Sequence, residues 1–249
     1  MMAAAATAAC SLHSAPSPQM RPVVDPSIRP FADICRFETV RDEGDENEVY
    51  HSTGFLIDSI HALTAAHNFA NTENDPVVDG FTRCGQFERT SVWDPEGRLV
   101  PGSYEVPSNY EDFEHDYALV RFASASPRRT AFRLPRGNEA FPAPGTRIHV
   151  AGYARGGTVI YHSVGVVLGS GDSTAIHHTA KTRRGMSGGP VWIETGTGEH
   201  VLIGVHSGAL GTWWKPGPTS ARRLSGDALD QVRRWVDQSR RSAAATPSP

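Results

Sequence analysis

The chain has 249 residues, 39% of them hydrophobic, and it contains 24 glycines and 18 prolines. It can therefore bury a real core, and its many turn-forming residues favour short strands over long helices. A formal net charge of −3 without a long basic run gives no reason to expect a nucleic-acid partner. No apolar run approaches the roughly 18 residues that a membrane span requires, so none is expected.

The two ends of the chain are poor in large apolar residues. Residues 1–22 are rich in Ala, Ser and Pro and lack the basic start of a signal peptide, so we expect a disordered leader or pro-segment. Residues 242–249, which end in TPSP, are expected to form a disordered tail.

Between these ends, apolar and polar residues mostly alternate, as they do in half-buried strands. Residues 52–67 predict two strands joined by a tight turn, and DYALVRF at 116–122 predicts a strongly apolar strand. Four more short strands are expected in TRIHVAGY, YHSVGVVLG, GGPVWIE and HVLIGVHSG. Only residues 225–241 repeat apolar residues at helical spacing.

A Pro- and Arg-rich segment at 124–145 divides the strands into two groups. The sequence therefore predicts an all-β fold class, with two small barrels and a terminal helix. We place the first barrel at residues 23–125, the linker and the second barrel at 126–224, and the helix at 225–241.

Cysteine and histidine patterns give no sign of a metal or a cofactor. Three cysteines, Cys10, Cys35 and Cys84, are too few for a disulfide framework. Cys35 and Cys84 could pair in an oxidising compartment, but the sequence alone does not establish this. The adjacent His177 and His178 would point to opposite faces of a strand, so they lack the paired spacing of metal ligands.

The segment TRRGMSGGPV at 182–191 places Ser187 among glycines. Taken alone, it fits a Gly-rich turn as well as it fits a nucleophile. A serine hydroxyl needs a base that accepts its proton and an acid that orients the base. His67 ends LTAAH and Asp116 opens DYALVRF, so both can lie at strand edges. The order His67, Asp116, Ser187 is one of three known chain orders of a Ser–His–Asp triad.

Together, GFLID with LTAAH, HDYALVRF and GMSGGPV resemble the trypsin-like serine peptidases. Within that superfamily the chain is most similar to the bacterial glutamyl endopeptidases, from about Val23 to Gly208. The resemblance implies two six-stranded antiparallel barrels of the chymotrypsin type and a C-terminal helix. It also implies hydrolysis of polypeptide substrates through an acyl-enzyme. We further expect a secreted monomer that is made as a zymogen.

The resemblance also assigns roles to individual residues. It places the oxyanion hole at the backbone N–H groups of Gly185 and Ser187. In glutamyl endopeptidases a matching threonine and histidine bind the carboxylate of the substrate P1 residue, which predicts cleavage after Glu or Asp. The substrate-binding residues implied in this way are Thr182, His206, Ser207 and Gly208.

Two departures from trypsin agree with the glutamyl branch. Met186 stands where trypsin has the aspartate that pairs with the new N-terminus, so that activation switch cannot operate here. Asn68 follows His67, where trypsin has a cysteine. The segment RPVVDPS resembles a mature start in the glutamyl branch, where the new amine reaches the substrate pocket. Cleavage just before Val23 or Val24 is therefore expected.

Three other interpretations stay open. GMSGG also fits the nucleophile elbow of α/β-hydrolases, although only His200 and His206 follow Ser187 and the alternating helices of that fold are missing. A protease-like binding protein without activity would share the fold. A serine peptidase with an apolar P1 preference would keep the triad without the carboxylate-binding roles. Lys181, Arg183 and Arg184 are expected to form a solvated basic edge that could attract acidic substrate segments.

Overall fold

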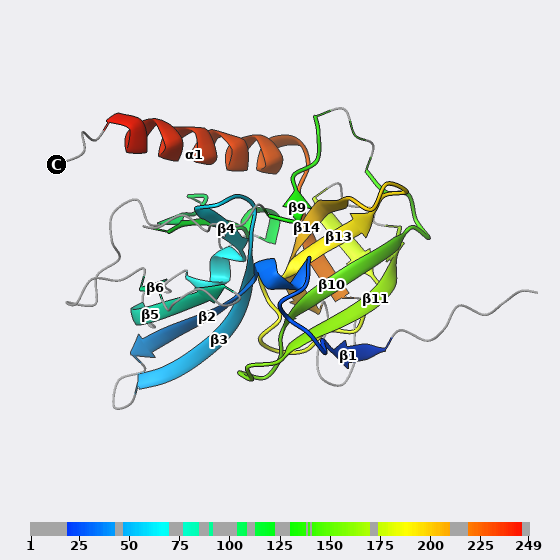
Figure 1. Ribbon diagram of the computed structural model, residues 1–249, viewed down its shortest axis with the longest axis horizontal. Helices are drawn as coiled ribbons and strands as arrows, with labels where there is room; N and C mark the ends of the chain where they lie inside the picture. Colours follow the sequence, from blue (N-terminus) through cyan, green and yellow to red (C-terminus); the bar gives the residue numbers. More distant parts are fainter. Residues whose placement is uncertain are drawn as a thin grey trace, which may run out of the picture.

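The computed structural model has two groups of antiparallel strands side by side and one long helix that runs along one side of the molecule (Figure 1). Among the described residues, no helix is long and apolar enough to cross a membrane. The structure describes residues 19–42, 47–69, 77–84, 90–91, 104–108, 113–122, 130–137, 139, 141–169, 174–209 and 219–245.

The first half of the chain forms a sheet in which all neighbouring strands are antiparallel. In this sheet Cys35 lies opposite Cys84 on the neighbouring strand, and the two cysteines form a disulfide. Within the described residues, no pairing closes this sheet into a ring. The order is β6 (Thr90–Ser91), β5 (Val77–Cys84), β2 (Ile34–Asp42), β3 (Asn47–Leu56), β4 (His61–Thr64), β8 (Ala118–Arg121) and β7 (Tyr104–Glu105).

The second half of the chain forms a closed six-stranded barrel, because its first and last strands also pair with each other. The order is β11 (Ile160–Leu168), β10 (Arg147–Tyr153), β13 (Pro190–Glu194), β14 (His200–Ala209), β15 (Thr219–Arg223) and β12 (Ala175–His178). Two short strands extend it: β1 (Met20–Pro22) pairs with β11, and β9 (Phe132–Arg133) pairs in parallel with β14.

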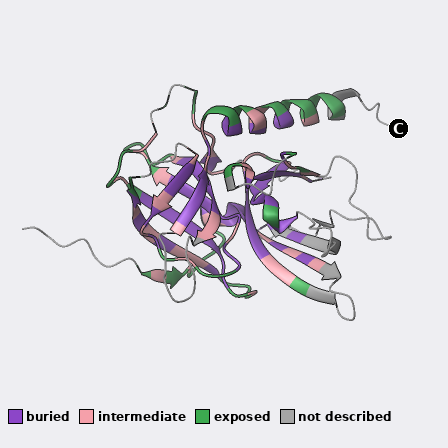
Figure 2. Cartoon of the chain, turned by 180° about the vertical axis from the view of Figure 1, so that it is seen from behind, coloured by how far each residue is buried: buried purple, intermediate pink, exposed green. Residues whose placement is uncertain are grey.

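Helix α1 (Gly226–Ala245) confirms the predicted terminal helix and extends it at its C-terminal end. One face of the helix is buried against the strands and the opposite face is exposed (Figure 2). Its C-terminal half is tied to the first sheet, where Ser239 Oγ lies 2.8 Å from His61 Nε2 and Arg240 pairs with Asp58 at 2.9 Å. The buried face consists of Ala228, Leu229, Val232, Trp235 and Val236. The all-β chymotrypsin-like class with a C-terminal helix is confirmed.

Three clusters of buried apolar side chains hold the molecule together. One belongs to the first sheet and one fills the second barrel. The largest joins the two groups of strands to α1, for example through Phe55 of β3, Trp192 of β13 and Trp235 of α1. Each fully buried side chain of this kind contributes about 1.5–3 kcal/mol. This shared core fixes the two groups of strands relative to each other.

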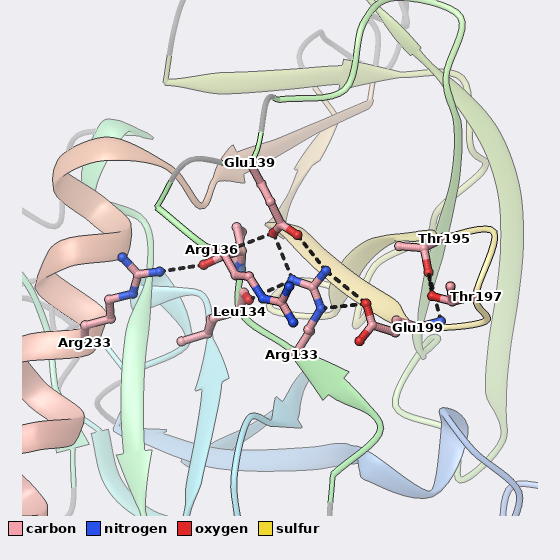
Figure 3. Close-up of polar contacts among 9 residues, drawn as sticks. Arg133, Leu134, Arg136, Glu139, Thr195, Thr197, Glu199 and Arg233 are labelled. Carbon is pink, nitrogen blue, oxygen red and sulfur yellow. Dashed lines mark hydrogen bonds and ion pairs between the residues drawn. The ribbon is translucent and has the colours of Figure 1, made fainter.

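The segment between the two groups of strands is held by a network of charges, shown in Figure 3. Arg133 forks onto Glu139 with bonds of 2.8 and 2.7 Å and also reaches Glu199 at 3.2 Å. The hydrogen bond from Arg133 is the main cause that lowers the pKa of Glu139 to about 2. Arg233 of α1 donates to the Pro135 carbonyl at 2.6 Å. The linker is thus fastened to both the β13–β14 hairpin and the helix.

Several predicted segments lie outside the described residues. They include residues 1–18 of the leader, residues 246–249 of the tail, and residues 124–129, 138 and 140 of the Pro- and Arg-rich segment. The boundaries proposed for the two barrels and the linker therefore stay predictions.

Candidate active site

His67 lies in the short 3-10 helix η2 (Ala66–Asn68), which follows β4 at the edge of the first sheet. The preceding Ala65 and Ala66 are fully buried, and such small side chains let the helix sit close against the sheet. The imidazole itself is 47% exposed, so a substrate can reach it. Asp116 lies just before β8 and its carboxylate is only 8% exposed.

The structure brings His67 and Asp116 together. His67 Nδ1 lies 2.9 and 3.0 Å from the two carboxylate oxygens of Asp116, and the His67 backbone N–H donates to Oδ1 at 3.1 Å. A carboxylate can only accept, so Nδ1 carries a proton and, in the neutral ring, Nε2 presents a lone pair. The sequence predicted this pair from two motifs 49 residues apart, and the structure places them in direct contact.

Asp116 stays ionised despite its burial. Burial alone would raise the pKa of this carboxyl, but the hydrogen bonds and charge interaction with His67 outweigh it and lower the pKa below its usual value. The nearby Ser207 hydroxyl acts in the same direction. Ser207 Oγ is buried and has no hydrogen bond of normal geometry with the described residues, so we regard its influence as electrostatic.

The loop that carries Ser187 has a backbone that only glycine can supply. Gly185 and Gly188 have φ values of +92° and +85°, in the left-handed region. A Cβ at Gly188 would lie 2.0 Å from the Thr53 carbonyl oxygen and 2.2 Å from Thr64 Oγ1. The loop is therefore pressed against the first sheet, and the glycines are what allow this approach.

Two backbone donors lie close to Ser187 in the chain, and one carbonyl oxygen lies close to its hydroxyl. Among the described residues, the backbone N–H groups of Gly185 and Ser187 have no hydrogen-bond acceptor. Backbone donors without a partner are costly unless water or a ligand satisfies them. The Ser187 hydroxyl donates to the Ser207 carbonyl at 3.1 Å.

Sequence reasoning missed the residues that brace this loop across the two groups of strands. Thr53 donates through its backbone N–H to the Ser187 carbonyl at 2.9 Å and through Oγ1 to the Gly185 carbonyl at 2.8 Å. Asn68 Nδ2 donates to Thr64 Oγ1 at 2.8 Å and to the Ser187 carbonyl at 3.2 Å. The signal was weak but present: Thr53 and Thr64 fall within GFLID and LTAAH or beside them, and Asn68 directly follows His67.

His206 is buried in β14, and its Nδ1 lies 3.0 Å from the Ser220 carbonyl. Since a carbonyl only accepts, Nδ1 carries the proton. Burial lowers the pKa of His206 to about 4, against a smaller raising effect of the bond to Ser220. His178 lies behind it, with ring centroids 6.0 Å apart, and its pKa is lowered to about 3, again chiefly by burial. Both rings are therefore neutral near pH 7.

The remaining predicted residues lie on β14 and in the segment that leads into the serine loop. Ser207 and Gly208 follow His206 on β14 and are half-buried. Thr182 is half-buried in the segment before the serine loop, and no hydrogen bond joins it to His206 in the described part of the chain. Met186 is fully buried in the core of the second barrel. Lys181, Arg183 and Arg184 are exposed.

The segment before the expected mature start runs along the outside of the second barrel. Met20–Pro22 pairs with β11, and the Val23 N–H donates to the Ile160 carbonyl at 2.8 Å. Val24 is 99% exposed. Among the residues that the structure describes, no group of three or more His, Cys, Asp and Glu side chains is placed to hold a metal ion.

A closed antiparallel barrel beside a second sheet, with a His–Asp pair on the sheet and a glycine-framed serine on a loop of the barrel, is the arrangement of chymotrypsin-fold peptidases. Residues 52–205 match the model of the trypsin-like peptidase domain, and the chain therefore belongs to that family. No curated protein sequence matches the chain.

Two solved structures share the fold. A Glu endopeptidase in complex with MPD is similar with a TM-score of 0.64 and 17% sequence identity, over 86% of this chain and 95% of the other. An inactivated protease paralogue of the scabies mite is similar with a TM-score of 0.57 and 16% identity, over 84% of this chain and 96% of the other.

Proposed function

We propose that the protein is a serine endopeptidase in which Ser187 is the nucleophile, His67 the general base and Asp116 the residue that orients the base. The observation that carries the proposal is that Asp116 holds His67 at three points, while the neighbouring Asn68 donates to the carbonyl of the glycine-framed Ser187. Each group alone has an ordinary structural explanation. Their joint placement between the two groups of strands matches what nucleophilic catalysis by serine needs.

The reaction follows from these atoms. The Ser187 hydroxyl leaves the Ser207 carbonyl, transfers its proton to His67 Nε2 and attacks the peptide carbonyl carbon. The negative charge that develops on the carbonyl oxygen is stabilised by the N–H groups of Gly185 and Ser187. His67 then gives the proton to the leaving amine as the C–N bond breaks. Water, deprotonated by His67, attacks the carbonyl carbon of the resulting acyl-enzyme. As the ester bond breaks, His67 returns the proton to the Ser187 oxygen and the acid product leaves.

We further propose cleavage after Glu or Asp, with His206 and Thr182 near the P1 side chain. A carboxylate that enters a partly dry pocket loses hydration and needs polar partners in exchange. In neutral His206, Nε2 carries a lone pair and no proton, so it cannot donate a hydrogen bond to the substrate carboxylate. Binding of a P1 carboxylate should therefore add a proton to His206, and the carboxylate in turn stabilises the charged ring.

Two alternatives each have an observation in their favour. The low pKa of His206 makes its pocket uncharged near pH 7, which favours a serine peptidase with an apolar P1 preference. The bond from the Ser187 hydroxyl to the Ser207 carbonyl, rather than to a base, suits a protease-like binding protein. Catalytic hydrogen bonds are often loose in substrate-free enzymes, so we favour the active peptidase.

We also propose that the protein is secreted and that removal of the leader activates it. The Cys35–Cys84 disulfide supports an oxidising compartment, because disulfides are rare in reducing ones. The exposed Val24 supports cleavage just before Val23 or Val24. Since the buried Met186 cannot bind a new amine, activation would not use the trypsin ion pair. A chain beginning at Val23 should then be more active toward acidic substrates than the full-length protein.

The experiment is a series of peptides that differ only at P1, with Glu, Asp, Gln, Leu or Lys, assayed for kcat/KM. We expect Glu to be cleaved best and Asp next. Fastest cleavage after Leu or Lys would overturn the glutamyl part and leave the serine peptidase intact. Absence of turnover, combined with equal peptide binding by wild type and Ser187→Ala, would instead support the binding protein.

A further inference from the structure

We propose that a second pocket, beside the serine loop, selects substrates with an acidic side chain at one of the two positions that follow the scissile bond. The inference rests on the proposed peptidase function and extends it to the leaving side of the substrate. The pocket has a volume of about 310 Å³, and its walls include Tyr50, His51, Arg155, Gly156, Arg184 and Gly185.

The position of this pocket relates it to the reacting bond. Gly185 belongs both to the pocket wall and to the proposed pair of oxyanion donors. The P1 residues proposed on β14, His206 to Gly208, are absent from the wall. A peptide whose carbonyl is held at Gly185 extends in both directions from that point. If its P1 side chain lies beside His206, the residues after the scissile bond lie toward the second pocket.

Backbone contacts keep the walls of the pocket in place. The Arg155 N–H donates to the Arg184 carbonyl at 2.7 Å, so the two arginine-bearing segments are joined directly. Arg36 Nη2 donates to the Gly156 carbonyl at 2.9 Å and lies 3.2 Å from His51 Nδ1. A Cβ at Gly156 would lie 2.4 Å from the His51 ring. The loop at 155–156 is therefore packed tightly against β3.

Arg155 adopts a backbone conformation that its type rarely uses. Its φ of +54° lies in the left-handed region, and it is the only non-glycine residue with a positive φ in the part of the chain that the structure describes. Such a conformation is unfavourable for a residue with a side chain and persists where the surroundings enforce it, often at functional sites. Here the enforced backbone places an arginine at the pocket wall.

Two arginines give the described wall of the pocket a positive charge. Among the described residues, no carboxylate pairs with Arg155 or Arg184, and both side chains reach solvent. The Arg184 guanidinium lies 5.8 Å from the centre of the Tyr50 ring. Arg36 is different, because Glu38 neutralises it at 2.8 Å. Burial, aided by Arg36, lowers the pKa of His51, so His51 adds no charge near pH 7.

The ligand that fits is a single carboxylate side chain carried by an extended peptide. Two arginines that line one cavity can bind the two oxygens of a Glu or Asp with charge-assisted hydrogen bonds. A lysine or arginine at the same substrate position would be repelled. Because successive side chains of an extended strand point to opposite sides, only one of the two leaving-side positions should show the preference.

Acyl transfer tests the leaving side separately from P1. One acyl-enzyme, formed from an ester substrate that carries the P1 residue cleaved best in the peptide series, is offered the amines Glu-Ala-amide and Gln-Ala-amide, then Ala-Glu-amide and Ala-Gln-amide. In one of these pairs we expect the acidic amine to capture the acyl group about tenfold better than its amide counterpart. Arg155→Gln combined with Arg184→Gln should abolish the difference, and Arg183→Gln, an exposed neighbour outside the pocket wall, should preserve it.

Equal capture in both pairs by the wild type, or a preference that survives the double replacement, would overturn the inference. Binding to Ser187→Ala of peptides with Glu or Gln at these positions, measured by calorimetry, gives a second readout that needs no turnover. If no acyl-enzyme forms, the proposed function fails. In that case peptide binding alone tests the proposed pocket. Tighter binding of the Glu peptides that requires Arg155 and Arg184 supports the proposal, and equal binding of the Glu and Gln peptides overturns it.

Discussion

The Asp116 carboxylate holds both the ring and the backbone of His67, through contacts of 2.9 and 3.0 Å to Nδ1 and a bond of 3.1 Å from the backbone N–H. The two contacts to Nδ1 set the tautomer of the His67 ring, and the bond from the backbone N–H fixes the main chain from which the side chain extends. The His67 ring can then turn only within narrow limits. A base held in this way keeps one nitrogen aimed at a fixed point, as proton transfer from a serine requires.

Replacing Asp116 with Asn should remove this control. An amide can donate as well as accept, so it favours the wrong tautomer of His67, and the equivalent change in a well-studied triad lowers kcat by about 10⁴. We expect a loss of about 10³ to 10⁴ in kcat with a small change in KM. The readout is steady-state kinetics, with thermal unfolding to show that the variant is folded.

A matched control exists elsewhere in the same sheet. Asp58 contacts His61 Nδ1 at 2.9 and 2.8 Å and accepts from the His61 N–H at 2.8 Å, but this pair lies against α1. Asp58→Asn should lower the unfolding temperature and leave kcat within about twofold of wild type. Equal kinetic losses in the two variants would show that the Asp116 effect is only structural.

The glycine frame gives a second prediction, on Gly188. Alanine there needs a left-handed backbone and places its Cβ 2.0 Å from the Thr53 oxygen, so the serine loop must move. A shift of this size should lower kcat/KM by about 10² or more. Gly196→Ala, in the open β13–β14 turn with no atom within 4 Å of the new Cβ, should behave like wild type. Unchanged activity of Gly188→Ala would contradict the proposal that the glycines hold the serine loop in its active position.

The neutral state of His206 predicts an unusual pH dependence of specificity. Its pKa of about 4 means that binding a P1 carboxylate near pH 7 takes up one proton. The ratio of kcat/KM for Glu over Gln should therefore fall about tenfold per pH unit between pH 6 and 8. Ionisation of the general base affects both substrates equally and cancels in the ratio. A ratio that is independent of pH would exclude His206 as the partner of the P1 carboxylate.

Burial of His178 predicts acid sensitivity of the fold. Its pKa falls from 6.5 to about 3 in the folded state, with burial as the main cause and the Ala180 backbone acting weakly in the opposite direction. Between these two pKa values the unfolded chain binds a proton that the folded chain does not bind, so stability is lost as the pH drops below 6.5. His178→Leu should raise the urea midpoint at pH 5 and change it little at pH 8. An equal change at both pH values would contradict this assignment.

The strands, the helix and the His67–Asp116 pair could be predicted from sequence because their signals are local. The strand pattern and the segments around His67, Asp116 and Ser187 can each be recognised from neighbouring residues. The order of the three residues along the chain then predicted a triad. The bracing by Thr53 and Asn68 could not be predicted, because it depends on how closely two sheets approach. The pairing of Cys35 with Cys84 likewise depends on the register of β2 and β5, which the sequence alone did not specify.

The pocket beside Gly185 was only partly visible in the sequence. Arg184 was placed on a solvated basic edge, which its exposure supports. Arg155 lies 29 residues earlier, and nothing in its own segment, YARGG, indicates a left-handed arginine facing the same cavity. Its role becomes apparent only when β3 and the loop after β10 are seen together.

The central claim is that Ser187 is an activated nucleophile, and covalent labelling tests it most directly. A fluorophosphonate reacts with a serine only where a base and oxyanion donors are aligned with it. We predict stoichiometric labelling of the mature wild-type protein, with the adduct mapped to Ser187 by mass spectrometry, and none in folded Ser187→Ala. Labelling should fall steeply in Asp116→Asn. A folded wild-type protein that stays unlabelled, or an adduct that persists in Ser187→Ala, would contradict the account.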